Sequence, residues 1–272
     1  MITSDSHMHT EFSTDSDAKI QSMIESAIAK GLHAVCITDH MDLEYPFHED
    51  TGKDAFQMDL KTYFSELEKW KDRYAGKIQI RRGIELGLQP QLADAYQELT
   101  GQYPFDFVIG SVHVIHGMDP YYGEIFENRT DREVYRETFQ ATMENLDAIS
   151  SFDVLGHLDY VVRYGKEQSK QYSYREFADE IDEILKKLLS MGKGIELNTA
   201  GWKYGLEFCH PHPEILRRYR ELGGEIITIG SDAHRPEHAA YEFGKAVTVL
   251  EACGFKYYTE FQGREPIFKQ LL

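Results

Sequence analysis

The segment Ala34-Val35-Cys36-Ile37-Thr38-Asp39-His40 decides the fold, because a short apolar, β-branched run ends directly in two side chains that bind protons or metals. Six other stretches change in the same way from an apolar run to polar residues, and segments with helical periodicity separate most of them. This alternation is typical of βα units around a parallel sheet, and seven units predict an α/β barrel. The expected strands begin at residue 2 and continue with 34–38, 78–84, 105–109, 152–155, 194–197 and 225–229.

The segments between these runs carry helix signals. Thr130-x-x-Glu133 and Ser173-x-x-Glu176 match the capping box, in which a hydroxyl and a carboxylate satisfy the first free amides of a helix. The segment 41–62 is polar and aperiodic instead. We expect it to form a long βα loop over the mouth of the barrel.

Composition narrows the class of protein. The 272 residues include 42% hydrophobic residues, enough for one large core, and we expect a single barrel domain over residues 1–272. A net charge of −17 disfavours nucleic-acid partners, and no apolar run is long enough for a membrane span. Cys36, Cys209 and Cys253 are far apart and odd in number, which argues against a disulfide framework. We therefore expect a cytoplasmic protein without membrane or nucleic-acid partners, and the sequence does not define its oligomeric state.

Side chains that can bind metals gather after the expected strands. His7 and His9 are two residues apart on an extended segment, so both point the same way, as chelation of one ion requires. Asp232-Ala233-His234 repeats this spacing near the other end of the chain. The carboxyl ends of parallel barrel strands meet on one face, so we expect one pocket there. The nine candidate ligands are His7, His9, Asp15, His40, Glu85, His113, His157, Asp232 and His234.

A plainer interpretation competes at each position. A single histidine is more often a surface or satisfied core residue than a ligand. That interpretation does not account for the set, because six of the twelve histidines fall at strand ends. Glu85 lies inside a strand-like run, where a buried carboxylate is costly unless a metal or a neighbouring arginine pairs with it. Among the other histidines, we expect His116 to approach the pocket.

These motifs, in this order, resemble the polymerase and histidinol phosphatase (PHP) superfamily. Chain length and the segments 110–119, 153–164 and 196–201 are most similar to its stand-alone histidinol-phosphate phosphatases. The resemblance implies a distorted, TIM-like (β/α)7 barrel with three metals at the C-terminal ends of the strands. It also implies hydrolysis of L-histidinol phosphate to L-histidinol and phosphate in histidine biosynthesis. The matching motifs are His7-x-His9, Thr38-Asp39-His40, Gly83-Ile84-Glu85, Gly110-Ser111-Val112-His113, Gly156-His157 and Ser231-Asp232-Ala233-His234.

The resemblance also implies a distribution of the ligands over three divalent ions. The first ion would take His7, His9, Glu85 and Asp232; the second would share Glu85 and take His113 and His157; the third would take Asp15, His40 and His234. Many members of the superfamily carry histidine at the position of Asp15. A carboxylate there shifts preference toward harder ions, so zinc, manganese and iron all stay open.

The chemistry of a phosphomonoester suggests roles for further residues. Its hydrolysis at neutral pH needs a hydroxide and neutralisation of the phosphoryl oxygens. We predict a hydroxide that bridges the first two ions, held by Glu85 and Asp232, with Arg163 as a further catalytic residue. The predicted substrate contacts are Arg163, Lys203, Asn198 and His116.

The leaving alkoxide needs a proton, which a water or Asp159 could supply. A histidinol phosphate substrate also carries an ammonium and an imidazole. An acidic rim formed by Asp42 and Glu44 would complement these groups.

Three other functions are compatible with the motifs. The first is a phosphoesterase of the same architecture that acts on a nucleotide, a sugar phosphate or phosphotyrosine. The second is an amidohydrolase-like enzyme that cleaves a C–N bond, although such barrels usually have eight strands and a bridging lysine. The third is a metal-storage or regulatory protein without catalysis, in which we would expect some ligand positions to be lost.

Overall fold

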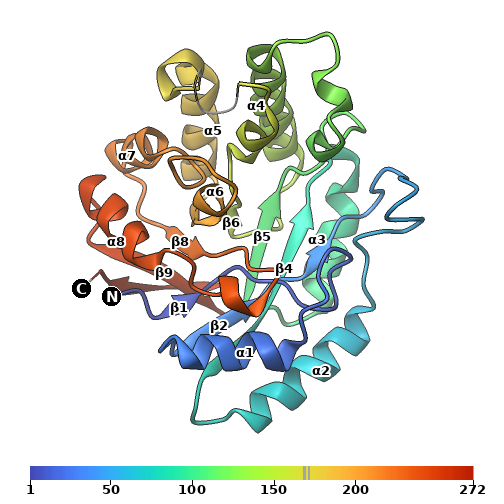
Figure 1. Cartoon of the computed structure of the whole chain (residues 1–272), viewed down its shortest axis with the longest axis vertical. Helices are drawn as coiled ribbons and strands as arrows, with labels where there is room; N and C mark the ends of the chain where they lie inside the picture. The colour runs from blue at the N-terminus through green and yellow to red at the C-terminus, as the bar shows by residue number, and fades with distance from the viewer. Residues whose placement is uncertain (168–169, 171, 272) are drawn as a thin grey trace.

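The computed structural model describes residues 1–167, 170 and 172–271, and its centre is a parallel sheet that curves into a barrel (Figure 1). Within these residues seven strands follow the order β1-β2-β4-β5-β6-β7-β8, and the short strand β3 pairs with β4. The amide of Ser6 donates to Ile229 O over 2.9 Å, which brings the last strand back beside the first. The predicted distorted (β/α)7 barrel is confirmed. The strands are β1 Ser4–Asp5, β2 Ala34–Ile37, β3 His40–Met41, β4 Gln79–Gly87, β5 Phe107–Ser111, β6 Val154–Leu155, β7 Gly194–Asn198 and β8 Ile227–Gly230.

The strands are buried on both faces. Every residue of β2, β5, β6, β7 and β8 is buried, because helices cover the outside of a parallel barrel and side chains fill its inside. This explains why the strands appear in the sequence as continuous apolar runs. The expected positions are correct to within about two residues at most ends, as is usual for boundaries inferred from a pattern.

Helices surround the strands (Figure 1). In α1 the buried residues Ile20, Met23, Ile24 and Ala27 recur at helical spacing and face the core. The α-helices are α1 Ile20–Ala29, α2 Leu60–Arg73, α3 Ala93–Gln102, α4 Asp131–Ala148, α5 Ala178–Ser190, α6 Ala200–Lys203, α7 Pro213–Glu221 and α8 Phe243–Ala252. Short 3-10 turns lie at η1 Pro90–Leu92, η2 Pro120–Tyr122, η3 Glu124–Phe126, η4 Tyr160–Tyr164, η6 Tyr174–Phe177 and η7 Pro236–His238.

One of the two predicted capping boxes is present. Thr130 and Glu133 make both reciprocal bonds at the start of α4. The prediction at Ser173 is wrong, because its side chain makes no capping bond. The chain forms the 3-10 turn η6 there, and the amide of Glu176 donates to the carbonyl of Ser173 instead of its hydroxyl.

A C-terminal hairpin closes the amino end of the barrel. Its strands are β9 Tyr257–Gln262 and β10 Glu265–Gln270. Phe261 stacks on Phe107 inside the barrel with ring centres 5.0 Å apart, and Arg81 Nη2 donates to Glu260 Oε2 over 2.6 Å. The sequence pattern predicts no strand in this region. The hairpin leaves the carboxyl ends of the strands as the open face.

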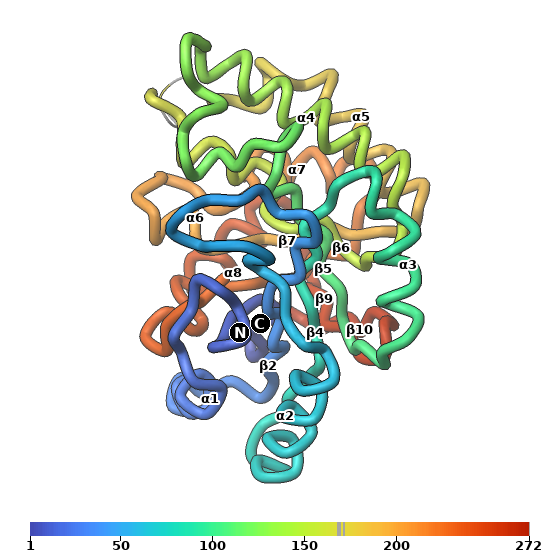
Figure 2. The backbone as a smooth tube through the Cα atoms, turned by 90° about the vertical axis from the view of Figure 1, so that its right-hand side faces the viewer, coloured from blue at the N-terminus to red at the C-terminus, as the bar shows by residue number. Residues whose placement is uncertain are grey.

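The segment between β3 and α2 extends from the barrel as a long excursion, drawn in blue in Figure 2. Asp50, in this segment, accepts a hydrogen bond from the Tyr122 hydroxyl over 2.9 Å, so the segment reaches the turn η2 across the open face. Among the described residues, no helix combines the length and apolarity needed to cross a membrane.

Candidate metal centre

The two ligand motifs at opposite ends of the sequence are joined by their backbones. The amide of His9 donates to Ala233 O over 2.9 Å, and the amide of Asp232 donates to His7 O over 2.8 Å. Asp232 adopts a left-handed backbone with φ of 52°, a conformation that aspartate enters more readily than most residues other than glycine. This backbone conformation and the bonds to the segment that follows β1 direct Asp232 toward the histidines. Its Oδ1 lies 3.3 Å from His9 Nε2.

Glu85 is the centre of the site. Its Oε2 lies 3.1 Å from Nε2 of His7 and 3.1 Å from Nδ1 of His40. Its Oε1 lies 2.9 Å from Nε2 of His157 and 3.3 Å from Nε2 of His113. The two oxygens of one carboxylate therefore face two different groups of imidazoles.

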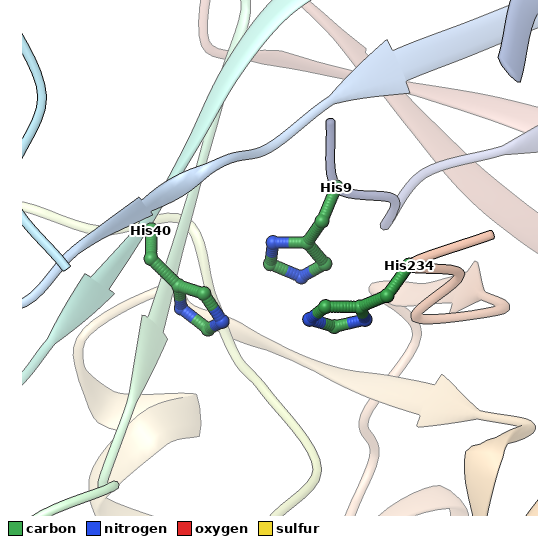
Figure 3. Close-up of side chains that lie close together, drawn as sticks. All are labelled: His9, His40 and His234. Atoms are coloured by element: carbon green, nitrogen blue, oxygen red, sulfur yellow. The ribbon is translucent and has the colours of Figure 1, made fainter. Parts of the chain in front are cut away.

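A third group lies beside the first two. Figure 3 shows the rings of His9, His40 and His234 turned toward one another from three separate segments of the chain. The ring centres of His9 and His234 are 4.0 Å apart, and those of His9 and His40 are 4.3 Å apart. Asp15 Oδ2 lies 3.1 Å from His234 Nε2. The structure thus brings all nine predicted ligands into one cluster.

Some buried polar atoms of this cluster make no hydrogen bond within the described residues, although its carboxylates and imidazoles face one another. Burial would raise the pKa of Glu85, but His7, His113 and His40 together hold it well below its usual value. Glu85 Oε2 and His40 Nδ1 are buried, and neither makes a hydrogen bond within the described part of the chain. Several triads of nitrogen and oxygen atoms, including those of His7, His9 and Glu85, lie within 4.8 Å of one another. This donor set fits divalent cations that accept imidazole and carboxylate together.

Two buried carboxylates hold candidate ligand histidines from behind: Glu196, which the sequence pattern did not single out, and Asp42, which was expected at an exposed acidic rim. Glu196 Oε1 lies 2.7 Å from His7 Nδ1, and Asp42 Oδ2 lies 2.6 Å from His113 Nδ1. Such contacts fix the orientation and tautomer of a ligating imidazole. Glu196 gives the same sequence signal as Glu85, a carboxylate inside an apolar strand.

The cluster opens into a cavity of about 860 Å³. Arg163 lies on its wall with its guanidinium carbon 5.2, 4.7 and 4.4 Å from the ring centres of Tyr160, Tyr164 and Tyr204. Lys203 also lines the cavity and donates to Asp232 O over 2.8 Å. Both predicted cationic residues thus face the same space as several candidate metal ligands.

The structure does not bring the other two predicted substrate contacts into the cavity. His116 has a left-handed backbone with φ of 49°, and its ring bonds Glu137 and Glu144 on α4 instead of lining the cavity. Asn198 is buried, and its amide donates to Glu196 over 3.1 Å and to Asp232 over 3.3 Å. Asn198 therefore contacts the candidate ligand Asp232 and does not line the cavity.

The structure also contradicts Asp159 as the proton donor and Asp42 and Glu44 as an exposed acidic rim. Asp159 is fully buried, and its carboxylate pairs with the ring of His210 over 2.7 Å and accepts the Tyr172 hydroxyl over 2.9 Å. Asp42 is buried against His113 rather than exposed at a rim, because β3 extends the chain into the barrel mouth. Glu44 is exposed and bonds Gln91, away from the cavity lining.

A parallel barrel with a cluster of nine imidazoles and carboxylates at its open end defines a metal-binding barrel protein. The chain belongs to the PHP domain family, whose model matches residues 5–200.

Several similar proteins are named as histidinol-phosphatases or probable histidinol-phosphatases. A probable histidinol-phosphatase of Clostridium acetobutylicum is 33% identical over 252 residues, covering 93% of this chain and 94% of that protein. A histidinol-phosphatase of Lactococcus lactis is 32% identical, covering 95% and 94%. The crystal structure of histidinol phosphate phosphatase from Lactococcus lactis, complexed with zinc, L-histidinol and phosphate, is 31% identical and superposes with a TM-score of 0.89. That superposition covers 97% of this chain and 98% of the other.

Proposed function

We propose that this protein is a metal-dependent phosphomonoesterase that hydrolyses L-histidinol phosphate to L-histidinol and phosphate. The observation that carries the proposal is the position of Glu85, whose two oxygens face separate groups of imidazoles in a cavity that also holds Arg163 and Lys203. The similarity to the Lactococcus lactis phosphatase that binds zinc, L-histidinol and phosphate supports the choice of substrate.

Three divalent ions are proposed, and the grouping of the side chains supports this number. His7, His9 and Asp232 would hold the first ion, His113 and His157 the second, and Glu85 would be shared between these two. Asp15, His40 and His234 would hold the third. Zinc suits the histidine-rich set, while the carboxylate of Asp15 leaves manganese and iron as candidates for the third position. Bound ions would lower the pKa of water toward 7 and neutralise charge on the phosphoryl oxygens.

The chain's own groups complete the binding of phosphate. Arg163 is a planar donor held between tyrosine rings, so its guanidinium is oriented before substrate arrives and loses little freedom on binding. Lys203 donates a hydrogen bond to the carbonyl of Asp232. The ammonium of Lys203 therefore lies beside Asp232, the proposed first-ion ligand that also contacts His234 of the third group. Together these cations would stabilise negative charge that grows on the phosphoryl group during the reaction.

We also propose that residues 1–272 act as one domain in the cytoplasm on a small-molecule substrate. One apolar core contains both Ile2 and Leu271, which supports the single domain. Cys36, Cys209 and Cys253 are buried free thiols, which suits a reducing compartment.

The test is phosphate release from L-histidinol phosphate after removal of metals and after addition of zinc, manganese or iron to the same preparation. We expect no release from the metal-free protein and recovery with at least one ion. Release that is unaffected by chelation, or absent with every ion, would overturn the proposal.

A further inference from the structure

We propose that Asp42 is a positioning residue that orients two ligand imidazoles at once, His113 through one oxygen and His40 through the other. The inference rests on the proposed metal sites. Because His113 would hold the second ion and His40 the third, the carboxylate of Asp42 would connect the ligands of these two ions.

The first contact is direct. Asp42 Oδ2 lies 2.6 Å from Nδ1 of His113, while Nε2 of the same ring lies 3.3 Å from Glu85 Oε1. His113 therefore has its near nitrogen on Asp42 and its far nitrogen directed at the ion-binding cluster. This is the arrangement in which an outer carboxylate fixes the tautomer of a ligating imidazole.

The second contact follows from two atoms that lack partners. Asp42 Oδ1 and His40 Nδ1 are both buried, neither makes a hydrogen bond within the described residues, and they lie 3.7 Å apart. Figure 3 shows the far nitrogen of His40 directed toward His234. The nearer oxygen, Glu85 Oε2 at 3.1 Å, belongs to the proposed ion-binding set, so Asp42 Oδ1 is the acceptor that is left for His40.

The neighbouring strand is shaped for this carboxylate. A Cβ atom at Gly87 of β4 would lie 2.4 Å from Asp42 Oδ2 and 2.3 Å from its Cγ, so a larger residue would displace the side chain. The amide of Asp42 is held by the carbonyl of Phe56 over 2.8 Å. The side chain thus has a defined place between β3 and β4.

Across the barrel, Glu196 also fills the space beside a strand glycine and contacts a ligand histidine, but it contacts only one imidazole, that of His7. A Cβ atom at Gly230 would lie 2.3 Å from Glu196 Oε1, the oxygen that contacts His7 Nδ1. Glu196 is therefore the matched control, because it is an equally buried carboxylate behind a different ligand.

The experiment compares Asp42→Asn with Glu196→Gln in the full chain, using zinc titration against a competing chelator. Asparagine keeps the size of the side chain but offers one acceptor oxygen, so it cannot serve both imidazoles. We expect Asp42→Asn to weaken two of the bound zinc ions by about 10- to 100-fold and to leave one unchanged. In the zinc-loaded protein the Nδ1–H signals of His40 and His113 should both shift in nitrogen-edited NMR spectra. In Glu196→Gln the His7 signal should shift instead.

A second variant, at Gly87, leaves the Asp42 carboxylate and its charge in place in the sequence. Gly87→Ala should displace the Asp42 carboxylate and weaken the same two ions, with circular dichroism confirming the fold. Unchanged zinc affinities in Asp42→Asn or Gly87→Ala would overturn the proposal. A shift confined to one histidine, or outright loss of one ion with both Nδ1–H signals retained, would also overturn it. Wild-type protein that binds zinc but releases no phosphate with zinc, manganese or iron would refute the proposed function alone, whereas wild-type protein that binds none of these ions would refute both.

Discussion

Glu85 Oε1 lies 2.9 Å from His157 Nε2, and both side chains are buried. The other oxygen of Glu85 faces His7 and His40, so a change at this carboxylate affects both groups of ligands. We predict that Glu85→Gln lowers kcat by more than about a hundredfold and reduces bound metal, because a neutral amide neither ligates well nor offsets the imidazoles. Metal content by elemental analysis and phosphate release measure both effects.

The control for Glu85 is Glu260→Gln. Glu260 is a buried glutamate that pairs with Arg81 at the opposite end of the barrel. This variant should lose stability while it keeps its metal. Near-normal turnover of Glu85→Gln would contradict the assignment of the site.

Arg163 offers the second prediction. We expect Arg163→Lys to lower kcat/KM by about a hundredfold, because an ammonium cannot reproduce a planar donor stacked among three tyrosine rings. Arg132, an exposed residue that pairs with Glu176, provides the control Arg132→Lys, which should stay within about twofold. Equal kinetics for the two variants would remove Arg163 from the catalytic machinery.

Metal binding should release protons at neutral pH. Burial opposes protonation of His40, but the carboxylates of Glu85, Asp15 and Asp42 outweigh it and raise the pKa of His40 to about 9 in the ion-free chain. The ring therefore carries a proton below pH 9 and must lose it to ligate, so the apparent affinity should weaken as the pH falls, by up to about tenfold per unit for each proton displaced. Calorimetric zinc titrations in two buffers of different ionisation enthalpy measure this release. Its absence at pH 7 would contradict the prediction.

Acid stability should depend on a pair outside the cavity. Arg218 donates to both oxygens of Asp182, over 2.9 and 2.6 Å, and together with the Tyr174 hydroxyl it lowers the pKa of Asp182 to about 2. Because the unfolded chain binds this proton more readily, the pair stabilises the fold above about pH 4. That stabilisation is lost as the pH falls toward 2.

Asp182→Asn should therefore lower the free energy of unfolding by up to about 1 kcal/mol at pH 6, and the difference from wild type should shrink toward pH 2. Thermal melts of metal-free protein across this range test the prediction. A difference that grows in acid would have the wrong sign.

The clustering of the candidate ligands could be predicted from the sequence because the carboxyl ends of parallel barrel strands converge on one face. His7, His40, His113, His157 and Asp232 each follow a buried run, and a closed parallel barrel needs no further information to bring them together. Of the two outer carboxylates, Glu196 lies inside an apolar strand and carries the same sequence signal as Glu85, whereas the position of Asp42 depends on finer geometry. Asp42 appeared to be part of an exposed loop until the short strand β3 carried it inward, and that strand is too brief to leave a periodic pattern.

The misplaced substrate contacts share a different cause. His116 follows a strand at a plausible distance, but a left-handed turn sends its ring to α4. Asn198 ends a strand as expected, yet its amide is used by Glu196 and Asp232. Spacing along the chain locates a residue near the open face, but local backbone angles and hydrogen bonds decide whether its side chain reaches the cavity.

The identity of the substrate is tested most directly by the ratio of kcat/KM values for different phosphate esters on one metal-loaded preparation. The panel compares L-histidinol phosphate with a nucleotide, a sugar phosphate and phosphotyrosine. We predict a preference of at least about a hundredfold for L-histidinol phosphate, equivalent to roughly 2.7 kcal/mol of transition-state discrimination. Slow turnover spread evenly over the panel, or a clear preference for another ester, would contradict the proposed function.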